Sequence, residues 1–384
     1  MNPNDFRAAS AGKVIRTPTG YAAFIPAKLP PALEYDNQLV LSLSRADAAL
    51  SELSGLGRYL PNPHLLIAPY VRREAVLSSR IEGTKASLAD VLINEMEQAN
   101  QRPEDDDVKE VRNYVAAMGY GLELLHKLPL SLRLVRDIHA RLMKNVRGGR
   151  ATPGEFRRSQ NWIGPPGSTI ETAPYVPPPP HHMDDLLADW ERFLHERRIL
   201  PDLIQCAIMH EQFEAIHPFL DGNGRIGRLL ITLFLMERGR LTQPLLYLSA
   251  YIEAHRLDYY DLLQRVRTHG DWMSWIRFFL TGVTEIALGA VGQAGRLMDL
   301  REKFRARLRE KAKALALLDE LFLNPYMSVA RAEQVLKVSN PTARQTVMLL
   351  QRKGMLEEIT GRTWGKLYLA KPIMETIELK GKSN

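Results

Sequence analysis

Residues 217–228 read HPFLDGNGRIGR, and this stretch decides how the rest of the chain is interpreted. Apolar residues recur at helical spacing on both sides of it, over 203–216 and 225–238. The pair His217 and Pro218 interrupts this period, because proline cannot continue a helix interior. The sequence therefore predicts two apolar helices joined by a short polar loop.

Two common motifs overlap this region, and neither is favoured. The three glycines have the G-x-G-x-x-G spacing of dinucleotide-binding folds, but that motif follows a β-strand, and here a helix and a proline precede it. His210 and Glu211 begin the H-E-x-x-H pattern of zinc proteases. Position 214 is Glu, so the second histidine ligand of that pattern is missing.

The glycines and arginines of the loop predict a site for phosphate. Gly222 and Gly224 allow backbone N–H groups to turn toward one anion, and the helix that follows points its positive end at the same place. Arg225 and Arg228 add guanidinium groups, which can bind phosphate with two parallel hydrogen bonds. A triphosphate suits this arrangement.

Two further side chains add chemistry to the loop. Asp221 is an acid beside the phosphate site, the usual way to hold Mg²⁺, which takes one or two carboxylates plus phosphate oxygens. His217 can serve as a general base, because a neutral imidazole accepts a proton from a hydroxyl. Each residue alone has a structural explanation, but their occurrence together within twelve residues predicts a phosphate-transfer site.

The stretch matches the Fic signature HPFxDGNGRxxR at every fixed position, so the chain resembles Fic-domain proteins. The resemblance implies transfer of AMP from ATP to a hydroxyl side chain (Ser, Thr or Tyr) of a target protein, with release of pyrophosphate. It implies that His217 deprotonates this hydroxyl and that Asp221 holds Mg²⁺ or Mn²⁺. The other motif residues would line the ATP site: Gly222, Asn223, Gly224, Arg225, Ile226, Gly227 and Arg228.

Residues 78–83 read SSRIEG and resemble the inhibitory motif of self-controlled Fic proteins, which is Ser or Thr, three residues, Glu, and Gly or Asn. Ser78, Glu82 and Gly83 occupy its fixed positions. Near Arg228, Glu82 would form a bidentate ion pair and occupy space meant for the ATP γ-phosphate. Two alternatives stay open: a plain helix end capped by Gly83, and a Glu82 that positions water to remove AMP from a modified protein.

Residues 161–176 predict a β-hairpin, because apolar pairs at 162–163 and 175–176 flank a run of Gly and Pro. The hairpin resembles the Fic flap, which would hold a target protein by strand pairing. Tyr259 lies where the resemblance implies the adenine pocket. A tyrosine packed in the core is the alternative for this residue.

The positive charge is concentrated in the last quarter of the chain. Residues 281–384 hold 18 Lys and Arg against 11 Asp and Glu, an excess of seven that equals the net charge of the whole chain. Two helices, 329–336 and 341–353, precede two short strands, 356–359 and 366–369, a pattern that predicts a winged helix-turn-helix. Its partner could be DNA or protein, so a DNA-binding regulator with a nucleotide-sensing Fic core is a second hypothesis.

The expected fold class is all-α: a Fic helical bundle with a short β-hairpin flap, followed by a C-terminal winged helix-turn-helix. We expect an N-terminal arm and helical region over 1–104, a catalytic core over 105–290, and a linker helix and winged-helix domain over 291–384. Residues 1–35 show no period and predict an irregular arm. Charged residues 297–313 predict a separate linker helix.

The composition fits a globular protein of two or three domains, with 384 residues, 45% hydrophobic and 25% charged. The single cysteine, Cys206, lies in an apolar run and is expected to be a buried residue in a reducing compartment. No apolar stretch reaches the length of a membrane span, so a cytoplasmic protein without membrane contact is expected. Self-modification and a homodimer are further expectations.

Overall fold

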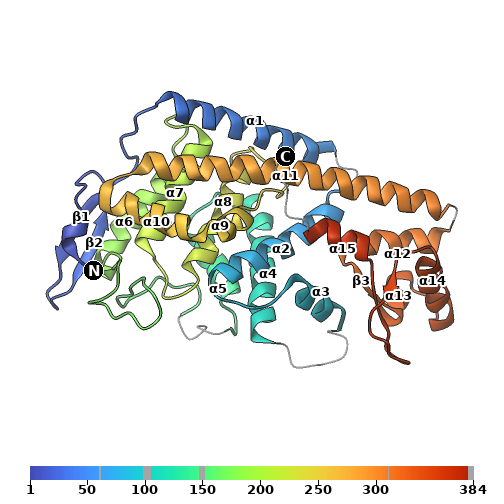
Figure 1. Cartoon of the computed structure of the whole chain (residues 1–384). Coiled ribbons are helices and arrows are strands. Elements are labelled where there is room, and N and C mark those ends of the chain that lie inside the picture. The colour runs from blue at the N-terminus through green and yellow to red at the C-terminus, as the bar shows by residue number, and fades with distance from the viewer. Residues whose placement is uncertain (60–61, 98–104, 147–151, 310, 379–384) are drawn as a thin grey trace.

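The computed structural model of the chain describes residues 1–59, 62–97, 105–146, 152–309 and 311–378. Over these residues the protein is mostly helical, as the sequence predicts, with two small antiparallel sheets (Figure 1). The elements in chain order are η1 Pro3–Asp5, β1 Gly12–Arg16, β2 Ala22–Pro26, α1 Asn37–Tyr59, α2 His64–Ile81, α3 Leu88–Glu97, α4 Asp106–Leu125, α5 Leu132–Leu142, α6 Pro180–His195, α7 Asp202–Ile216, α8 Asn223–Glu237, α9 Ser249–Ala254, α10 Arg256–His269, α11 Trp272–Arg307, α12 Ala312–Leu323, β3 Tyr326–Ser328, α13 Val329–Leu336, α14 Asn340–Arg352, β4 Glu357–Glu358, β5 Leu367–Leu369 and α15 Lys371–Glu378.

The centre of the helical body is α7, in which every residue from Leu203 to Ile216 is buried. It packs against α6, α8 and α11, so even its polar residues, among them His210, Glu211 and Glu214, are buried. Cys206 lies in this helix with no exposed surface, as predicted. The next helix, α8, packs on α2, α4 and α5 as well as on α7. The loop between α7 and α8, which holds the HPFLDGNGRIGR motif, is therefore fixed by well-packed helices.

The longest helix, α11, corrects the prediction of a separate linker helix over 297–313. It runs without interruption to Arg307 and packs along α1 at the top of the body (Figure 1). Three glycines, at 289, 292 and 295, suggest a break, since each costs about 1 kcal/mol in a helix interior. Buried side chains such as Ala290, Ala294 and Leu297 hold the helix together across them. The expected boundary at 290/291 thus falls inside a continuous helix.

We expected an irregular N-terminal arm, but the arm contains a β-hairpin. Strands β1 and β2 pair in antiparallel register around a turn at residues 17–21. The arm does lie on the later core, because the Phe24 N–H donates to the Val176 carbonyl over 2.9 Å. Phe6, Phe24 and Tyr175 form a cluster of rings there. The pairing was missed because β2, AAFIP, is buried along nearly its whole length and so lacks the alternation of apolar and polar residues that marks a half-buried strand.

The hairpin predicted over 161–176 is reduced to one antiparallel bridge between Ile163 and Tyr175. Each of these residues donates its N–H to the other's carbonyl, over 2.9 and 3.3 Å. Between them the chain forms turns rather than strands. Prolines at 165, 166 and 174 lack the N–H that a longer ladder requires, which explains the difference.

Helix α2, which carries the SSRIEG segment, begins at His64 and includes Pro69. It ends at Ile81, with Glu82 as the C-cap and Gly83 at a φ of 102°. A buried carboxylate fixes the middle of the helix: Glu74 accepts hydrogen bonds from the Ser249 hydroxyl over 2.6 Å and the Tyr114 hydroxyl over 3.2 Å. The helix is thereby attached to α9 and α4.

The C-terminal part contains the predicted helices and strands and two elements that were not predicted, β3 and α15. Its sheet has the order β3, β5, β4, and all neighbours are antiparallel. The part contacts the rest of the body, because α12 packs on α2 and the Asn324 amide donates to the Leu92 carbonyl over 2.9 Å. A winged helix remains a prediction for this part. The expected boundary at 104/105 adjoins residues outside the described ranges.

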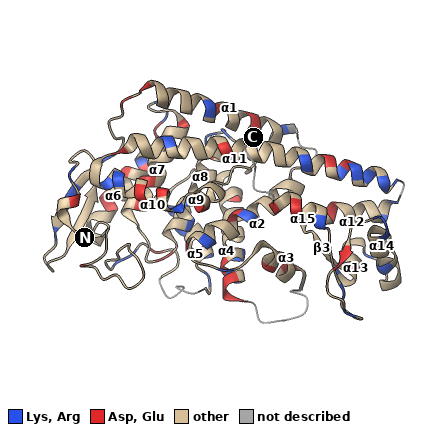
Figure 2. Cartoon of the chain, viewed as in Figure 1, with Lys and Arg blue, Asp and Glu red and all other residues tan. Residues whose placement is uncertain are grey.

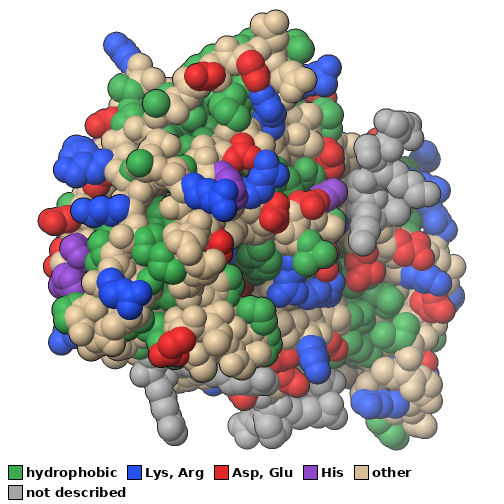
Figure 3. All heavy atoms as spheres, turned by 60° about the vertical axis from the view of Figure 1, so that its left-hand side comes forward, with side chains coloured by type: hydrophobic (Ala, Val, Ile, Leu, Met, Phe, Trp, Pro, Cys, Tyr) green, Lys and Arg blue, Asp and Glu red, His purple; other side chains and the backbone are tan. Residues whose placement is uncertain are grey.

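Charge is distributed unevenly in the described chain. Lys and Arg gather along the C-terminal half of α11 (Figure 2). On the face nearest the N-terminal hairpin, charges of both signs are interspersed with hydrophobic side chains (Figure 3). By length and composition alone α11 could cross a membrane, and in the described chain it contacts α1, α7 and α10.

Candidate active site

The motif loop leads into the N-terminal, positive end of α8. His217 ends α7 in the left-handed region, with φ 50°, and Gly222 precedes α8 with φ 80°. A side chain at Gly222 would be strained, and its Cβ would lie 3.0 Å from the Met143 sulfur. The first N–H groups of α8 have no partner within the helix, so they are available to an anion.

Two side chains hold the loop in this shape. Asn223 accepts the Phe219 N–H and donates to the Phe219 carbonyl, each over 2.8 Å. His139 stacks on the Phe219 ring with centroids 3.7 Å apart. The side chain of Asn223 is therefore occupied by the loop itself, so a contact of this residue with ATP, which stays a prediction, would use its backbone N–H.

The hydrogen bonds of His139 determine which of its two ring nitrogens carries the proton. Its Nδ1 accepts the Gly154 N–H over 2.9 Å, so the proton sits on Nε2 and is donated to the Asp221 carbonyl over 3.0 Å. Burial lowers the pKa of His139 to about 4, which keeps the ring neutral. The sequence gives no signal for this residue, because it comes from α5, far from the motif in the chain.

Asp221 and Arg225 lie together at the start of α8. The Asp221 carboxylate accepts the Gly222 N–H over 2.5 Å and lies 3.4 Å from Arg225 Nη2. The other end of the Arg225 guanidinium lies 3.3 Å from Glu110. Arg225 is therefore already neutralised by two acids, and it positions Asp221.

A divalent cation fits beside Asp221, whose side chain is 46% exposed. Within the described ranges no group of three or more His, Cys, Asp and Glu side chains could hold a metal. A single carboxylate suits Mg²⁺ that takes its remaining ligands from nucleotide phosphates and water. Such an ion would depend on ATP for its binding.

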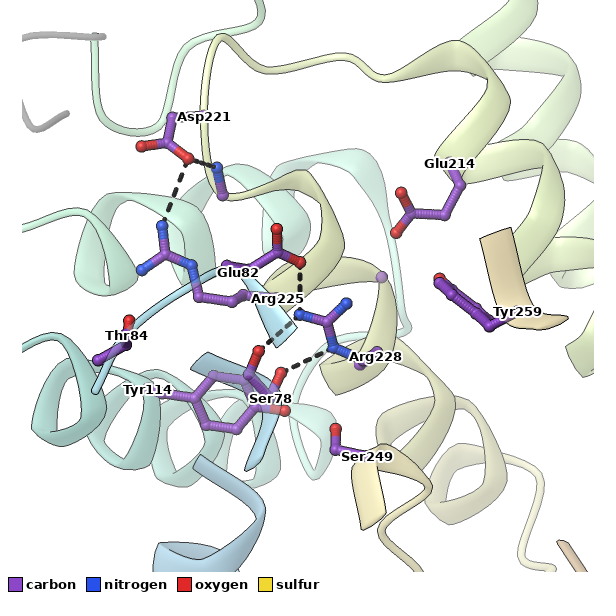
Figure 4. A network of polar contacts seen from close by, with 12 residues as sticks. Ser78, Glu82, Thr84, Tyr114, Glu214, Asp221, Arg225, Arg228, Ser249 and Tyr259 are labelled. Atoms are coloured by element: carbon purple, nitrogen blue, oxygen red, sulfur yellow. Dashed lines mark hydrogen bonds and ion pairs between the residues drawn. The ribbon is translucent and has the colours of Figure 1, made fainter. Parts of the chain in front are cut away.

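Arg228 is held by the segment predicted to be inhibitory. Its Nη2 donates to Glu82 Oε1 over 2.7 Å and to the Ser78 carbonyl over 2.9 Å, and its Nε donates to the Ser78 hydroxyl over 2.9 Å (Figure 4). The contact with Glu82 uses one nitrogen, so the bidentate pair that we expected is wrong. Burial lowers the pKa of Arg228, but the charge and hydrogen bond of Glu82, together with the effects of Tyr259 and Tyr260, raise it by more, so the pKa is raised overall.

The Glu82 carboxylate also covers the start of α8. A Cβ built on Gly224 would lie 2.3 Å from Glu82 Oε1, which shows how closely the carboxylate approaches the backbone there. The helix positive end and Arg228 thus both contact an anion that belongs to the chain itself. Any phosphate at this position would have to displace it.

His217 is largely buried, with 19% of its side chain exposed. Its carbonyl accepts hydrogen bonds from Arg157 Nε over 2.9 Å and from the Asn161 amide over 3.4 Å. Burial, together with the charges of Arg157 and Arg267, lowers the pKa of His217 to about 3. The imidazole is therefore neutral at physiological pH and can accept a proton. Neither arginine was identified from the sequence.

Glu214 lies one turn before His217 on α7 and was not identified as a site residue either. Its Oε2 lies 3.9 Å from His217 Nδ1, and burial raises its pKa to about 7. A Cβ on Gly227 would lie 2.5 Å from Glu214 Oε1. Gly227 therefore makes room for this carboxyl group, whereas we expected it to line the ATP site.

Two other predicted ATP-binding residues face the core. Ile226 has no exposed surface. Tyr259 is 1% exposed, and its hydroxyl lies 2.9 Å from His210 Nε2. Both environments favour packing roles, the alternative that the sequence left open for Tyr259.

Two stretches of the chain that contribute to this site match models of a known protein family. Residues 129–235, which include the whole motif loop, match the model of the Fic/DOC family, and residues 40–123 match that of the Fic/DOC family N-terminal region. The chain belongs to the Fic/DOC family. The N-terminal match includes the segment with Ser78 and Glu82, so both sides of the Arg228 contact lie within the family regions of this Fic protein.

Curated relatives carry the name protein adenylyltransferase Fic. This chain is 33% identical over 204 residues to the relative from Aedes aegypti and 30% identical over 203 residues to the relative from Drosophila melanogaster. Each match covers 52% of this chain and 37% of the relative. The chain thus spans little more than a third of the length of these relatives.

Solved structures share the fold. A Fic family protein from Desulfovibrio desulfuricans G20 matches with a TM-score of 0.57 and 20% identity, over 93% of this chain and all of that one. Fic-1 from C. elegans, residues 134–508, matches with a TM-score of 0.51 and 20% identity, over 67% of this chain and 74% of that one. At these identities the likeness concerns the fold alone.

Proposed function

We propose that this Fic protein is a protein adenylyltransferase that transfers AMP from ATP to a hydroxyl side chain of a target protein. One observation carries the proposal: a neutral, largely buried His217 lies on the same short loop as the amide end of α8 and Asp221. A proton acceptor, an anion site and a metal ligand are what attack of a hydroxyl on a phosphate requires. The names of the curated relatives support the same activity.

The reaction assigns each group a step. The target oxygen bonds to the α-phosphorus of ATP while the bond from that phosphorus to the bridging oxygen breaks and pyrophosphate leaves. His217 takes the hydroxyl proton, and the N–H groups at Gly222 to Gly224 with Arg228 stabilise the phosphate charge. Bound at Asp221, Mg²⁺ or Mn²⁺ would neutralise phosphate oxygens.

The same geometry supports inhibition in the resting state. Glu82 contacts Arg228 and the first turn of α8, so the γ-phosphate and Glu82 compete for one place. Removal of AMP with Glu82 as the water-positioning group is the alternative for this residue. Labelled ATP with wild type and Glu82→Gly separates the two, because inhibition predicts more labelling in the variant and hydrolysis predicts slower removal of pre-installed AMP.

We propose that the target segment pairs with the flap near the Ile163 and Tyr175 bridge. Backbone pairing accepts many sequences, so the target is a protein segment with an exposed hydroxyl rather than one fixed motif. Self-modification, a homodimer and a cytoplasmic location belong to the same proposal.

The direct test is intact-mass analysis after incubation with ATP and Mg²⁺, with a lysate protein or the chain itself as acceptor. Addition of one AMP unit by wild type and none by His217→Ala supports the proposal. Addition of phosphate alone, or of AMP by both proteins, contradicts it.

A second candidate function is DNA binding by the C-terminal part. Trp364 is 81% exposed between Arg362 and Lys366 in the segment that joins β4 to β5, and Arg344 is exposed on α14. These are side chains that contact phosphates and bases. Affinity for a DNA duplex should fall steeply between 50 and 200 mM salt. No binding, or binding that ignores salt, contradicts this function.

A further inference from the structure

Two buried polar atoms of the active site have no hydrogen-bond partner among the described residues. They are His217 Nδ1 and Glu214 Oε1, and the nearer carboxylate oxygen, Oε2, lies 3.9 Å from that Nδ1. Buried polar groups are rarely left unpaired, because each costs about 1–3 kcal/mol. An unpartnered Nδ1 one helical turn from a buried carboxylate therefore indicates a hydrogen bond that forms in another state of the site.

The base that the proposed function requires is a weak one as it stands. A general base works best with a pKa near the operating pH, whereas burial, Arg157 and Arg267 lower the pKa of His217 to about 3. The backbone carbonyl of Glu214 acts in the opposite direction and raises this pKa, but by less. Some further group has to stabilise the imidazolium that forms when the hydroxyl proton arrives.

We propose that Glu214 is a positioning residue that accepts the Nδ1–H of His217, so that Nε2 faces the target hydroxyl with its lone pair free. This inference rests on the proposed function for its catalytic consequence. A closure of about 1 Å would bring Oε2 within hydrogen-bonding distance of Nδ1. The arrangement follows the logic of other carboxylate-oriented histidine bases.

The proton balance is simple. The target O–H proton moves to His217 Nε2 as its oxygen bonds to the α-phosphorus, and the Nδ1–H stays on the imidazole, bonded to the Glu214 carboxylate. The pair then carries one positive and one negative charge until Nε2 releases its proton to solvent. Ionised Glu214 is needed for this step, because a protonated carboxyl group cannot balance the imidazolium charge.

Several charged groups influence the ionisation of Glu214. Burial raises its pKa to about 7, while Arg228 and Arg267 lower it and Glu82 and Glu211 raise it. Glu214 therefore ionises as the pH rises through about 7. Displacement of Glu82 from Arg228 removes one of the groups that raise this pKa, so release of inhibition and ionisation of Glu214 favour one another.

The first experiment reads the tautomer and does not depend on activity. The full chain is labelled with ¹⁵N-histidine, and His217 signals are assigned by their loss in His217→Ala. At pH 8 we expect the proton on Nδ1 in wild type. Glu214→Met, which keeps the length of the side chain and removes its oxygens, should move the proton to Nε2. Gln212→Met, another buried change on α7, should leave the tautomer as in wild type.

The second experiment measures AMP transfer against pH. Glu214→Met should lower kcat by about 10²-fold, the lower end of a general base's contribution, with KM for ATP unchanged. Wild-type kcat should rise through about pH 7, and the variant should lose this rise. Glu214→Gln, which still offers a carbonyl to Nδ1–H, should restore part of kcat without the rise.

The outcomes separate this inference from the proposed function. If Nδ1 keeps its proton in a folded Glu214→Met, the backbone carbonyl sets the tautomer and the inference is overturned. The same holds if kcat and its pH profile are those of wild type. If no variant and no wild-type protein transfers AMP, the proposed function fails, while the tautomer measurement still decides the role of Glu214.

Discussion

Replacement of Glu82 should activate the enzyme, because it removes the anion that occupies the phosphate site. Glu82 Oε1 lies 2.7 Å from Arg228 Nη2. A hydrogen bond between charged groups contributes about 1.5–3 kcal/mol. The Glu82 side chain is 36% exposed, so we take the lower part of this range, about 1.5 kcal/mol. Since 1.4 kcal/mol is a factor of ten, a phosphate that no longer competes with Glu82 should bind about tenfold more productively.

The assay is the initial rate of AMP transfer at ATP concentrations well below KM, where the rate reports kcat/KM. Glu82→Gly and Glu82→Gln should both raise kcat/KM by about tenfold, since both remove the carboxylate charge. Glu253→Gln is the matched control, because Glu253 lies 3.9 Å from Arg80 of the same helix α2 but does not contact Arg228. Its rate should equal that of wild type.

Double variants test whether the two residues share one site. Arg228→Ala relieves the contact with Glu82 but also deletes a phosphate ligand, so it should not gain activity. Glu82→Gly combined with Arg228→Ala should be as slow as Arg228→Ala alone, because coupled residues do not act additively. Unchanged kcat/KM in folded Glu82→Gly and Glu82→Gln, or independent effects in the double variant, would refute the competition.

Three further predictions concern metal, packing and pH. Asp221→Ala should lose Mg²⁺-dependent transfer while keeping its fold, and recovery of the wild-type rate in excess Mg²⁺ would mean that another group holds the ion. Gly227→Ala should lower the free energy of unfolding in urea by about 1–3 kcal/mol, because its Cβ would lie 2.5 Å from Glu214, whereas Gly289→Ala, with no atom within 4 Å, should raise it by about 0.5–1 kcal/mol. The lowered pKa of His139, about 4 against 6.5, means that the unfolded chain binds this proton first, so stability falls as the pH falls below 6.5. Between pH 7 and 5, wild type should lose about 2 kcal/mol more than His139→Asn in urea unfolding, and equal losses would contradict the neutral, buried state of His139.

The parts of the fold that were predicted from sequence are those with strong local signals. Helices such as α7 and α8 have an apolar period many residues long, and the break between them is marked by His217 and Pro218. The HPFLDGNGRIGR loop identifies its own chemistry because its phosphate, metal and proton groups are neighbours in the chain. Local residues also place the Glu82 segment at a helix end.

The parts that were missed depend on contacts between distant segments. The β1 and β2 hairpin is stabilised against Tyr175 and Val176, which the local sequence does not reveal. The continuity of α11 across its glycines depends on burial of Ala290 and Ala294. This burial overrides the low helix propensity of the glycines. Tertiary packing decides both.

The same reason explains which site residues were missed. His139 and Arg157 reach the loop from other segments, so nothing in their own surroundings predicts a role. Glu214 is different, because it lies three residues before His217 in the sequence. It was considered only as a failed zinc ligand, and its proximity to His217 on one helix face was the signal that could have identified it.

The central claim is that this site, with His217 as the general base, transfers the AMP portion of ATP to protein, and the position of a radioactive label tests it most directly. The Glu82→Gly protein is incubated with Mg²⁺ and ATP labelled at either the α- or the γ-phosphate, with and without His217→Ala. We predict that only the α-label becomes attached to protein, and that His217→Ala abolishes the attachment in a folded chain. Attachment of the γ-label, or equal attachment of the α-label with and without His217, would contradict the account.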